Sequence, residues 1–217
     1  IVYDSGDKEG GIALAREVAA SGDARARRSL ADMYRGAGRF AESEPLYSEL
    51  IAAQPNEWRS YFSRGAARER LGRWPEAEAD FRRALELSPD QPDVLNYLGY
   101  AWVDRGENLQ QGLAMIRRAA EIRPMSGAII DSLGWAYFRL GDYAQAVDWL
   151  EAAVRLEPAD PTLNDHLGDV YWRLNRRIEA RFQWQRALTF APENPEAIQR
   201  KIENGLPEEA APQSATR

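Results

Sequence analysis

Residues 163–192 read LNDHLGDVYWRLNRRIEARFQWQRALTFAP, and the spacing of three residues in this stretch decides the fold. A small residue, Gly168, precedes a large one, Trp184, by 16 positions, and Pro192 ends the stretch. The same three landmarks recur in phase toward the amino terminus. The small residues are Ala31, Gly65, Gly99 and Gly134, the large ones are Tyr47, Phe81, Ile116 and Leu150, and the prolines are Pro55, Pro89, Pro124 and Pro158. Successive prolines are 34, 35, 34 and 34 residues apart, a period typical of helical repeat arrays.

The period divides most of the chain into five repeats, which we place at 24–57, 58–91, 92–126, 127–160 and 161–194. Each repeat reads as two helices, because apolar residues follow helical spacing on both sides of a central breaker. The breakers, all of which tolerate a left-handed backbone, are Gly38, Gly72, Gly106, Gly141 and Asn175. In the fourth repeat, Gly134 removes the side chain that would keep the two helices apart, and Leu150 fills the space between them.

Two repeats depart from the pattern. The second has Arg64 and Arg68 at places that hold leucine and an aromatic residue elsewhere, so we expect its first helix to pack loosely. The third carries one extra residue within 105–111, which we expect in the turn between its helices.

The chain extends beyond the repeats at both ends. Residues 1–23 are predicted to contain the second helix of a truncated upstream repeat. Residues 195–204 are predicted to form a capping helix with Ile198 turned inward and Lys201 outward. Residues 205–217 have little apolar surface to bury and are predicted to be a disordered tail.

The composition excludes most familiar enzyme chemistry. The chain has 217 residues, 28 Lys plus Arg against 34 Asp plus Glu, a single histidine (His166) and no cysteine. The lack of cysteine excludes disulfides, thiolate zinc sites and cysteine nucleophiles, and one histidine excludes a two-histidine metal site. We therefore predict no catalytic residues, no metal and no cofactor. The net charge of -6 argues against nucleic acid as a partner, since binding to phosphates relies on clustered Lys and Arg.

The recurring pattern resembles the tetratricopeptide repeat, whose unit is 34 residues of helix, turn and helix. The resemblance covers about four fifths of the chain and holds at several places in all five copies. It implies an all-α fold, a right-handed superhelical solenoid in which the first helix of each repeat lines the concave side. It also implies a non-enzymatic scaffold that binds a protein or peptide partner.

The inward-facing places of the first helices give a candidate partner-binding groove. Its amino-terminal half is rich in arginine, whereas its carboxy-terminal half combines large aromatic residues with acids. The candidate groove residues are Arg28, Asn96, Tyr100, Asp131, Trp135, Phe138, Asp165, Asp169, Trp172 and Arg173. Several aromatic rings on such a face favour a binding surface, because they bury a large area at low entropic cost. The alternative is that the rings pack against the first helix of the next repeat and are mostly covered.

Three aspartates of this groove allow more than one interpretation. Asp165 and Asp169 are one helical turn apart, and Asp131 lies one repeat earlier. Their carboxylates could bind a cation or the Arg and Lys of a partner, or Asp169 could simply pair with Arg173 four residues on. His166 is about 100° from Asp165 around the helix. A metal site or a catalytic dyad there is disfavoured, because its other ligands would have to come from a chain with no other histidine and no cysteine. An enzyme with a carboxylate site formed by the three aspartates is a further hypothesis.

A finer resemblance involves residues 95–116, 129–153 and 164–188. These three stretches are similar to bacterial outer-membrane tetratricopeptide lipoproteins that act as adaptors of carboxy-terminal processing proteases. The resemblance implies such a protease as partner and a periplasmic location, associated with the outer membrane through a lipid anchor upstream of the given sequence. Two alternatives stay open: a cytoplasmic scaffold within a complex, and a structural module that self-assembles into homo-oligomers through its open ends.

Overall fold

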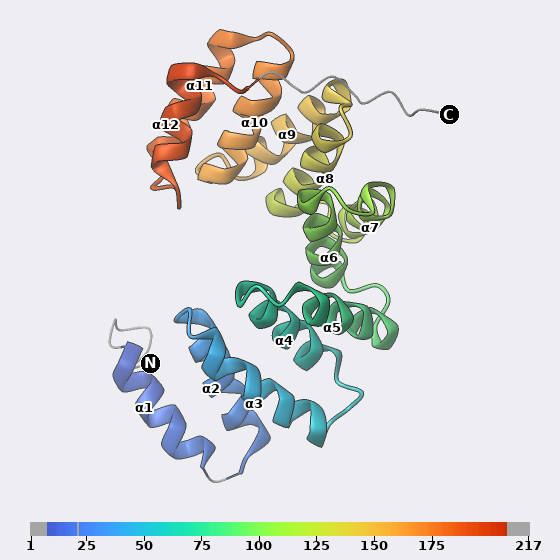
Figure 1. The fold of residues 1–217 in the computed structure, drawn as a ribbon, viewed down its shortest axis with the longest axis vertical. Helices are drawn as coiled ribbons and strands as arrows, with labels where there is room; N and C mark the ends of the chain where they lie inside the picture. Colours follow the sequence, from blue (N-terminus) through green and yellow to red (C-terminus); the bar gives the residue numbers. More distant parts are fainter. Residues whose placement is uncertain (1–7, 21, 208–217) are drawn as a thin grey trace. The chain divides into compact units, whose positions relative to one another are not determined.

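The computed structural model describes residues 8–20 and 22–207, and every regular element within these ranges is an α-helix (Figure 1). This confirms the predicted all-α fold class. Residues 1–7 of the predicted upstream segment and residues 208–217 of the predicted tail lie outside the described ranges. Among the described helices, none combines the length and the apolar character that a membrane crossing requires.

The chain divides into two compact units, which we describe separately: unit 1, Ile1–Val94, and unit 2, Leu95–Arg217. The helices of unit 1 are α1 (Lys8–Ala19), α2 (Ala24–Gly36), α3 (Phe40–Ala53), α4 (Trp58–Arg70) and α5 (Trp74–Leu87). Those of unit 2 are α6 (Pro92–Arg105, which begins in the last residues of unit 1), α7 (Leu109–Ile122), α8 (Gly127–Arg139), α9 (Tyr143–Leu156), α10 (Pro161–Arg173), α11 (Arg177–Leu188) and α12 (Pro195–Asn204). The pairs from α2–α3 to α10–α11 each fall within one 34- or 35-residue repeat.

The turn inside each repeat depends on a left-handed residue. Gly38, Gly72, Gly106, Gly141 and Asn175 have φ angles of 74°, 75°, 71°, 77° and 62°. In the other repeats the second helix begins two residues after the left-handed residue. In the third repeat Asn108 is left-handed as well, with φ 45°, and α7 begins three residues after Gly106. The extra residue of this repeat therefore lies in the turn, as predicted.

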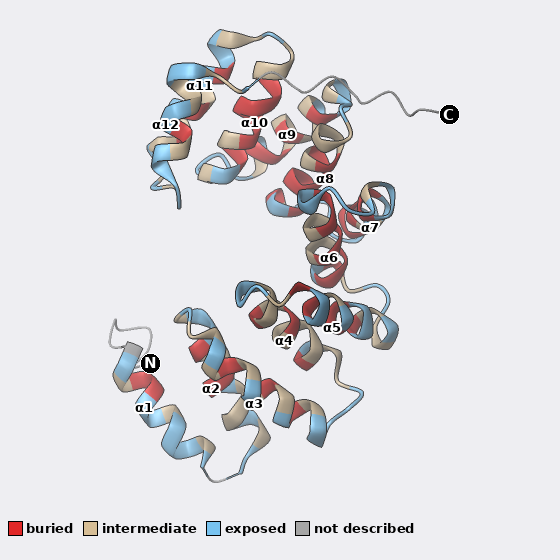
Figure 2. Cartoon of the chain, viewed as in Figure 1, coloured by how far each residue is buried: buried red, intermediate tan, exposed pale blue. Residues whose placement is uncertain are grey.

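The two helices of a repeat approach closely at the small residue. A Cβ built on Gly134 of α8 would lie 2.6 Å from Cγ of Leu150 on α9, closer than real side chains come. Leu150 is fully buried, and Figure 2 shows the buried residues concentrated where paired helices face each other. The close approach and the burial confirm the predicted steric role of Gly134 and Leu150. Burying one such side chain stabilises the helix pair by about 1.5–3 kcal/mol.

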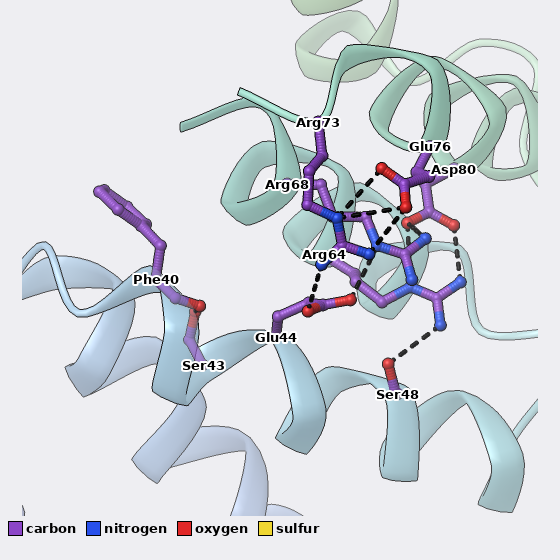
Figure 3. A network of polar contacts seen from close by, with 9 residues as sticks. All are labelled: Phe40, Ser43, Glu44, Ser48, Arg64, Arg68, Arg73, Glu76 and Asp80. Atoms are coloured by element: carbon purple, nitrogen blue, oxygen red, sulfur yellow. Dashed lines mark hydrogen bonds and ion pairs between the residues drawn. The ribbon is translucent and has the colours of Figure 1, made fainter. Parts of the chain in front are cut away.

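In the second repeat an ionic network takes the place of apolar contacts (Figure 3). Arg64 of α4 donates from Nε and Nη2 to the two carboxylate oxygens of Asp80 on α5, at 2.9 and 2.7 Å. Arg68 donates from Nη1 to Asp80 at 2.8 Å and from Nε to Glu44 of α3 at 2.9 Å. The remaining amino group of Arg64 reaches Ser48 Oγ at 3.1 Å. Asp80 is only 4% exposed, so this network lies inside unit 1.

The expectation that the first helix of the second repeat packs loosely is therefore wrong. The side chains of Arg64 and Arg68 are each only 16% exposed, because their stems cover apolar surface while their guanidinium groups bind carboxylates. Ala67 on the same helix is fully buried. The first repeat has Leu46 at the position that corresponds to Asp80. The charged residues of the second repeat therefore replace a set that is largely apolar in the first repeat, namely Leu30, Tyr34 and Leu46.

We predict that Asp80→Ala lowers the free energy of unfolding by about 3 kcal/mol, because it leaves the nearly buried guanidinium group of Arg64 without a carboxylate and that of Arg68 with Glu44 alone. Urea unfolding followed by circular dichroism measures the loss. The triple variant Arg64→Leu, Arg68→Tyr, Asp80→Leu installs the residues of the first repeat and should return to within about 1 kcal/mol of the wild type. A triple variant as unstable as Asp80→Ala would show that the network is more than a substitute for apolar packing.

Candidate functional site

In unit 2 the first helices of three successive repeats are α6, α8 and α10 (Figure 1), and we call the surface they form the first-helix face. Side-chain contacts join neighbouring helices. Arg139 of α8 donates from Nη1 to the main-chain carbonyl of Asp104 on α6 at 2.6 Å. His166 of α10 lies 2.9 Å from the carboxylate of Asp131 on α8. The nine predicted groove residues other than Arg28 all lie on these three helices.

A stack of rings connects α8 to α10. The indole of Trp135 lies against Phe138, with ring centroids 4.7 Å apart and planes at 10°, and against His166, at 4.1 Å and 15°. His166 belongs to the first helix of the next repeat, so for Trp135 the contact that sequence analysis gave as the alternative is present. Trp135 and Phe138 nevertheless remain half-buried, which leaves part of both rings at the surface.

His166 forms a buried pair with Asp131. Its Nδ1 lies 3.1 and 2.9 Å from the two carboxylate oxygens, and the two residues are 8% and 4% exposed. Burial alone would lower the pKa of the imidazole, but the charge of Asp131 and its hydrogen bond outweigh burial and raise the pKa above 6.5. The prediction from the sequence argued against a metal or a catalytic role for His166, but it named no side chain that pairs with the imidazole. The partner lies 35 residues away, and the 34-residue period that brings it near was already visible in the sequence.

The other two aspartates of the face share a lysine. Lys201 of α12 donates from Nζ to both oxygens of Asp165, at 2.9 and 2.8 Å, and to Asp169 at 2.8 Å. Asp169 also accepts a hydrogen bond of 2.9 Å from Nε1 of Trp184. Burial would lower the pKa of Lys201, but the two carboxylates hold it above its usual value.

This role of Lys201 was not predicted, and the prediction that its side chain points outward is wrong. A signal was available, because Lys201 lies three residues after the buried Ile198 and therefore on the same side of α12. The side chain of Lys201 points inward because α12 covers Asp165 and Asp169, and two covered carboxylates need a cation as partner.

Trp172 and Arg173, at the end of α10, contact the segment that follows α12. A Cβ built on Gly205 would overlap the six-membered ring of Trp172, so this glycine lies directly on the indole. Arg173 donates from Nη1 to the carbonyl of Pro207 at 2.8 Å. Arg177 also lies over Trp172, with its guanidinium carbon 3.8 Å from a ring centroid. A segment of the chain itself thus contacts two of the predicted groove residues.

Tyr100 and Asn96 bring α6 into the face. Both are half-buried. Burial raises the pKa of the Tyr100 hydroxyl, and the carboxylates of Asp104 and Asp131 raise it further. The hydroxyl is therefore a neutral hydrogen-bonding group at physiological pH. The side-chain carbonyl of Asn96 is buried and accepts no hydrogen bond within the described part of the chain.

Arg28 belongs to unit 1 and has a structural role there. Its Nη2 donates to Glu57 Oε2 and to Ser60 Oγ, both at 2.7 Å. Glu57 in turn caps α4 by accepting from the backbone N–H of Ser60 at 2.9 Å. Arg28 therefore ties the first repeat to the start of the second.

The three aspartates do not share one ion. Asp131 faces His166, whereas Asp165 and Asp169 face Lys201. Within residues 8–20 and 22–207, no group of three or more His, Asp or Glu is arranged to hold a metal ion. The arrangement offers aromatic surface and hydrogen bonds, and its buried charges are paired.

The helix pairs and the first-helix face define an α-helical repeat protein. A tetratricopeptide repeat model matches residues 2–58, 34–92 and 62–126, and a second TPR repeat model matches residues 134–175. The first three matches together span more than half of the chain, which therefore belongs to the tetratricopeptide repeat family. Proteins of this family are generally non-catalytic scaffolds that bind proteins or peptides.

Solved structures share the fold at low sequence identity. A thermophilic TPR protein of Thermus thermophilus is 19% identical, with a TM-score of 0.70 over 84% of this chain and 98% of that chain. PilF of Pseudomonas aeruginosa is 17% identical, with 0.68 over 85% and 80%. MamA of Desulfovibrio magneticus is 18% identical, with 0.66 over 77% and 94%. Identities this low show the fold alone, which is the predicted tetratricopeptide solenoid.

We predict that the stability contributed by the Asp131–His166 pair falls as the pH rises. The pKa of His166 is higher in the folded chain than the 6.5 of an unfolded one, so the contribution is complete below pH 6.5 and is lost as the pH rises through the folded pKa. Because the chain has one histidine, a proton NMR titration follows a single imidazole. Its midpoint should exceed 6.5, and the gap in urea midpoint between wild type and His166→Gln should shrink with rising pH. A midpoint at or below 6.5 would contradict the charged pair.

Proposed function

We propose that the chain is a non-enzymatic scaffold that binds an extended segment of a partner protein on the first-helix face of unit 2. The observation that carries this proposal is the position of Tyr100, Trp135, Phe138 and Trp172 on three adjacent first helices, all of them half-buried. Their contacts inside the protein hold the rings in place, while the uncovered parts offer apolar area. Rigid aromatic rings of this kind carry much of the binding energy at protein interfaces.

The charges of the face favour recognition through rings and hydrogen bonds. Asp131 is paired with His166, and Asp165 and Asp169 are paired with Lys201. A partner that placed its own charge against these groups would have to break a buried pair, which is costly. An extended segment that presents apolar side chains and main-chain amides meets no such obstacle, because Tyr100 and Arg173 can hydrogen-bond to main-chain groups.

A finer role is also proposed, that of a periplasmic adaptor which delivers substrates to a carboxy-terminal processing protease. Its support is the similarity of residues 95–116, 129–153 and 164–188 to outer-membrane tetratricopeptide lipoproteins with that role. In this role the first-helix face would hold an unfolded or terminal segment of the substrate, and another surface would contact the protease.

Photo-crosslinking tests the scaffold proposal. We expect p-benzoylphenylalanine in place of Phe138 to capture a partner in cells, whereas the same residue in place of Phe182 should not. Phe182 is the matched control, because it is an exposed phenylalanine on the second helix α11. With the captured partner purified, Trp172→Ala should weaken binding at least about tenfold by calorimetry, as expected for a hot spot. Equal capture at both positions, or unchanged affinity, would remove the first-helix face from the binding site.

Reconstituted proteolysis tests the adaptor role. A carboxy-terminal processing protease from the same genome should degrade the captured partner about tenfold faster when the chain is added, because the adaptor raises the local substrate concentration. Phe138→Ala should abolish the acceleration, and Phe182→Ala should leave it intact. Binding of the partner without any acceleration would refute the adaptor role and leave the scaffold proposal standing.

A further inference from the structure

The segment after α12 is shaped to lie on the first-helix face. Gly205 ends the helix with φ 75° and ψ -170°, a backbone conformation that residues other than glycine rarely adopt. The same glycine lies on Trp172 at a distance that excludes a Cβ. Two independent requirements, the backbone angle and the contact with the ring, therefore demand glycine at this one position.

The residues that follow Gly205 are restricted to an extended course. Pro207 has a fixed φ, and a residue before proline, here Leu206, is confined to extended backbone angles. The carbonyl of Pro207 accepts the hydrogen bond of 2.8 Å from Arg173. An extended tripeptide is thus held at two points, by its glycine on an indole and by its third carbonyl on a guanidinium group.

We propose that Trp172 and Arg173 form a subsite for an extended Gly-x-Pro segment, and that the chain's own Gly205–Pro207 occupies it until a partner's segment takes its place. The proposal rests on the proposed function, since it names the peptide class that the first-helix face takes. The partner segment has a glycine that lies on Trp172 and, two residues later, a backbone carbonyl that accepts from Arg173.

The covalent attachment of Gly205–Pro207 to α12 explains how a small contact can keep the subsite occupied. Gly205 directly follows α12, and α12 is fixed to α10 by the bonds from Lys201 to Asp165 and Asp169. A segment attached at so short a distance has an effective concentration of about millimolar or higher. A competing peptide then binds only to the fraction of molecules whose subsite is open, so its apparent affinity is reduced by that fraction.

A peptide in trans tests the proposal without knowledge of the partner. The probe is a fluorescein-labelled peptide with the sequence of residues 203–210, ENGLPEEA, titrated with the full chain in a fluorescence anisotropy assay. Gly205→Ala in the chain clashes with Trp172 and should expose the subsite, so the probe should bind at least about tenfold more tightly than it binds wild type. Trp172→Ala added to Gly205→Ala should abolish the gain, and the probe ENALPEEA should not bind.

Gly141→Ala is the matched control variant. Gly141 has a similar φ of 77°, but a Cβ there meets nothing within 4 Å, so this substitution strains a turn without disturbing Trp172. It should bind the probe like wild type. If circular dichroism shows that Gly205→Ala is unfolded, Pro207→Gly serves as the milder variant, because it loosens the tethered segment without a clash and should tighten probe binding by a smaller factor.

The outcomes separate this inference from the proposed function. If Gly205→Ala folds and shows no gain in affinity, or if the gain survives Trp172→Ala, the subsite assignment is wrong, while capture of a partner at Phe138 would still support the scaffold. If the gain is seen and depends on Trp172, but no partner is captured at Phe138, the subsite stands and the scaffold proposal fails.

Discussion

The close approach of two helices at a missing Cβ is the constraint on which the rest of the structure depends. Because Gly134 has no side chain, Leu150 can fill the space between α8 and α9. A Cβ on Gly65, Gly99 or Gly168 would likewise collide with the large residue of its own repeat, whereas the first repeat has Ala31 at this place. The apolar core is thereby contained within and between hairpins. Residues on the remaining side of each first helix are not required for that core, so they are available to form a surface such as the first-helix face.

The repeat period determined how much could be predicted from the sequence. Helix pairs, left-handed turn residues and the extra residue of the third repeat were predictable because a fixed geometry recurs at a fixed interval. Lys201 and Gly205 lie 34 residues after Leu167 and Tyr171, but they differ from these counterparts in residue type, so the period did not predict what they do. Arg64, Arg68 and Asp80 broke the pattern within one repeat, and single positions suggested loose packing. Only the three considered together indicate that the charges compensate one another.

The helices that carry the candidate groove residues could be predicted from the sequence, but the contacts of their side chains could not. Period and helical spacing placed Trp135, Asp131 and Trp172 on neighbouring first helices, and the structure finds them there. The partners of these side chains depend on rotamers and on segments distant in sequence, which spacing cannot supply. His166 is the clearest case, because its neighbour on α10 suggested no interaction while Asp131, one repeat earlier, forms a buried pair with it.

The capping helix joins the end of the array to the candidate site. Ile198 covers apolar surface, Lys201 on the same side neutralises Asp165 and Asp169, and Gly205 then directs the chain onto Trp172. These three functions are carried by eight consecutive residues, 198–205. A displacement of α12 would therefore uncover apolar surface, leave Asp165 and Asp169 without their lysine and release the segment from Trp172 at the same time. Whether the subsite at Trp172 and Arg173 is occupied by Gly205–Pro207 is consequently linked to the position of α12. A ligand that replaces Gly205–Pro207 without moving α12 keeps the apolar contacts of Ile198 and the ion pairs of Lys201 intact.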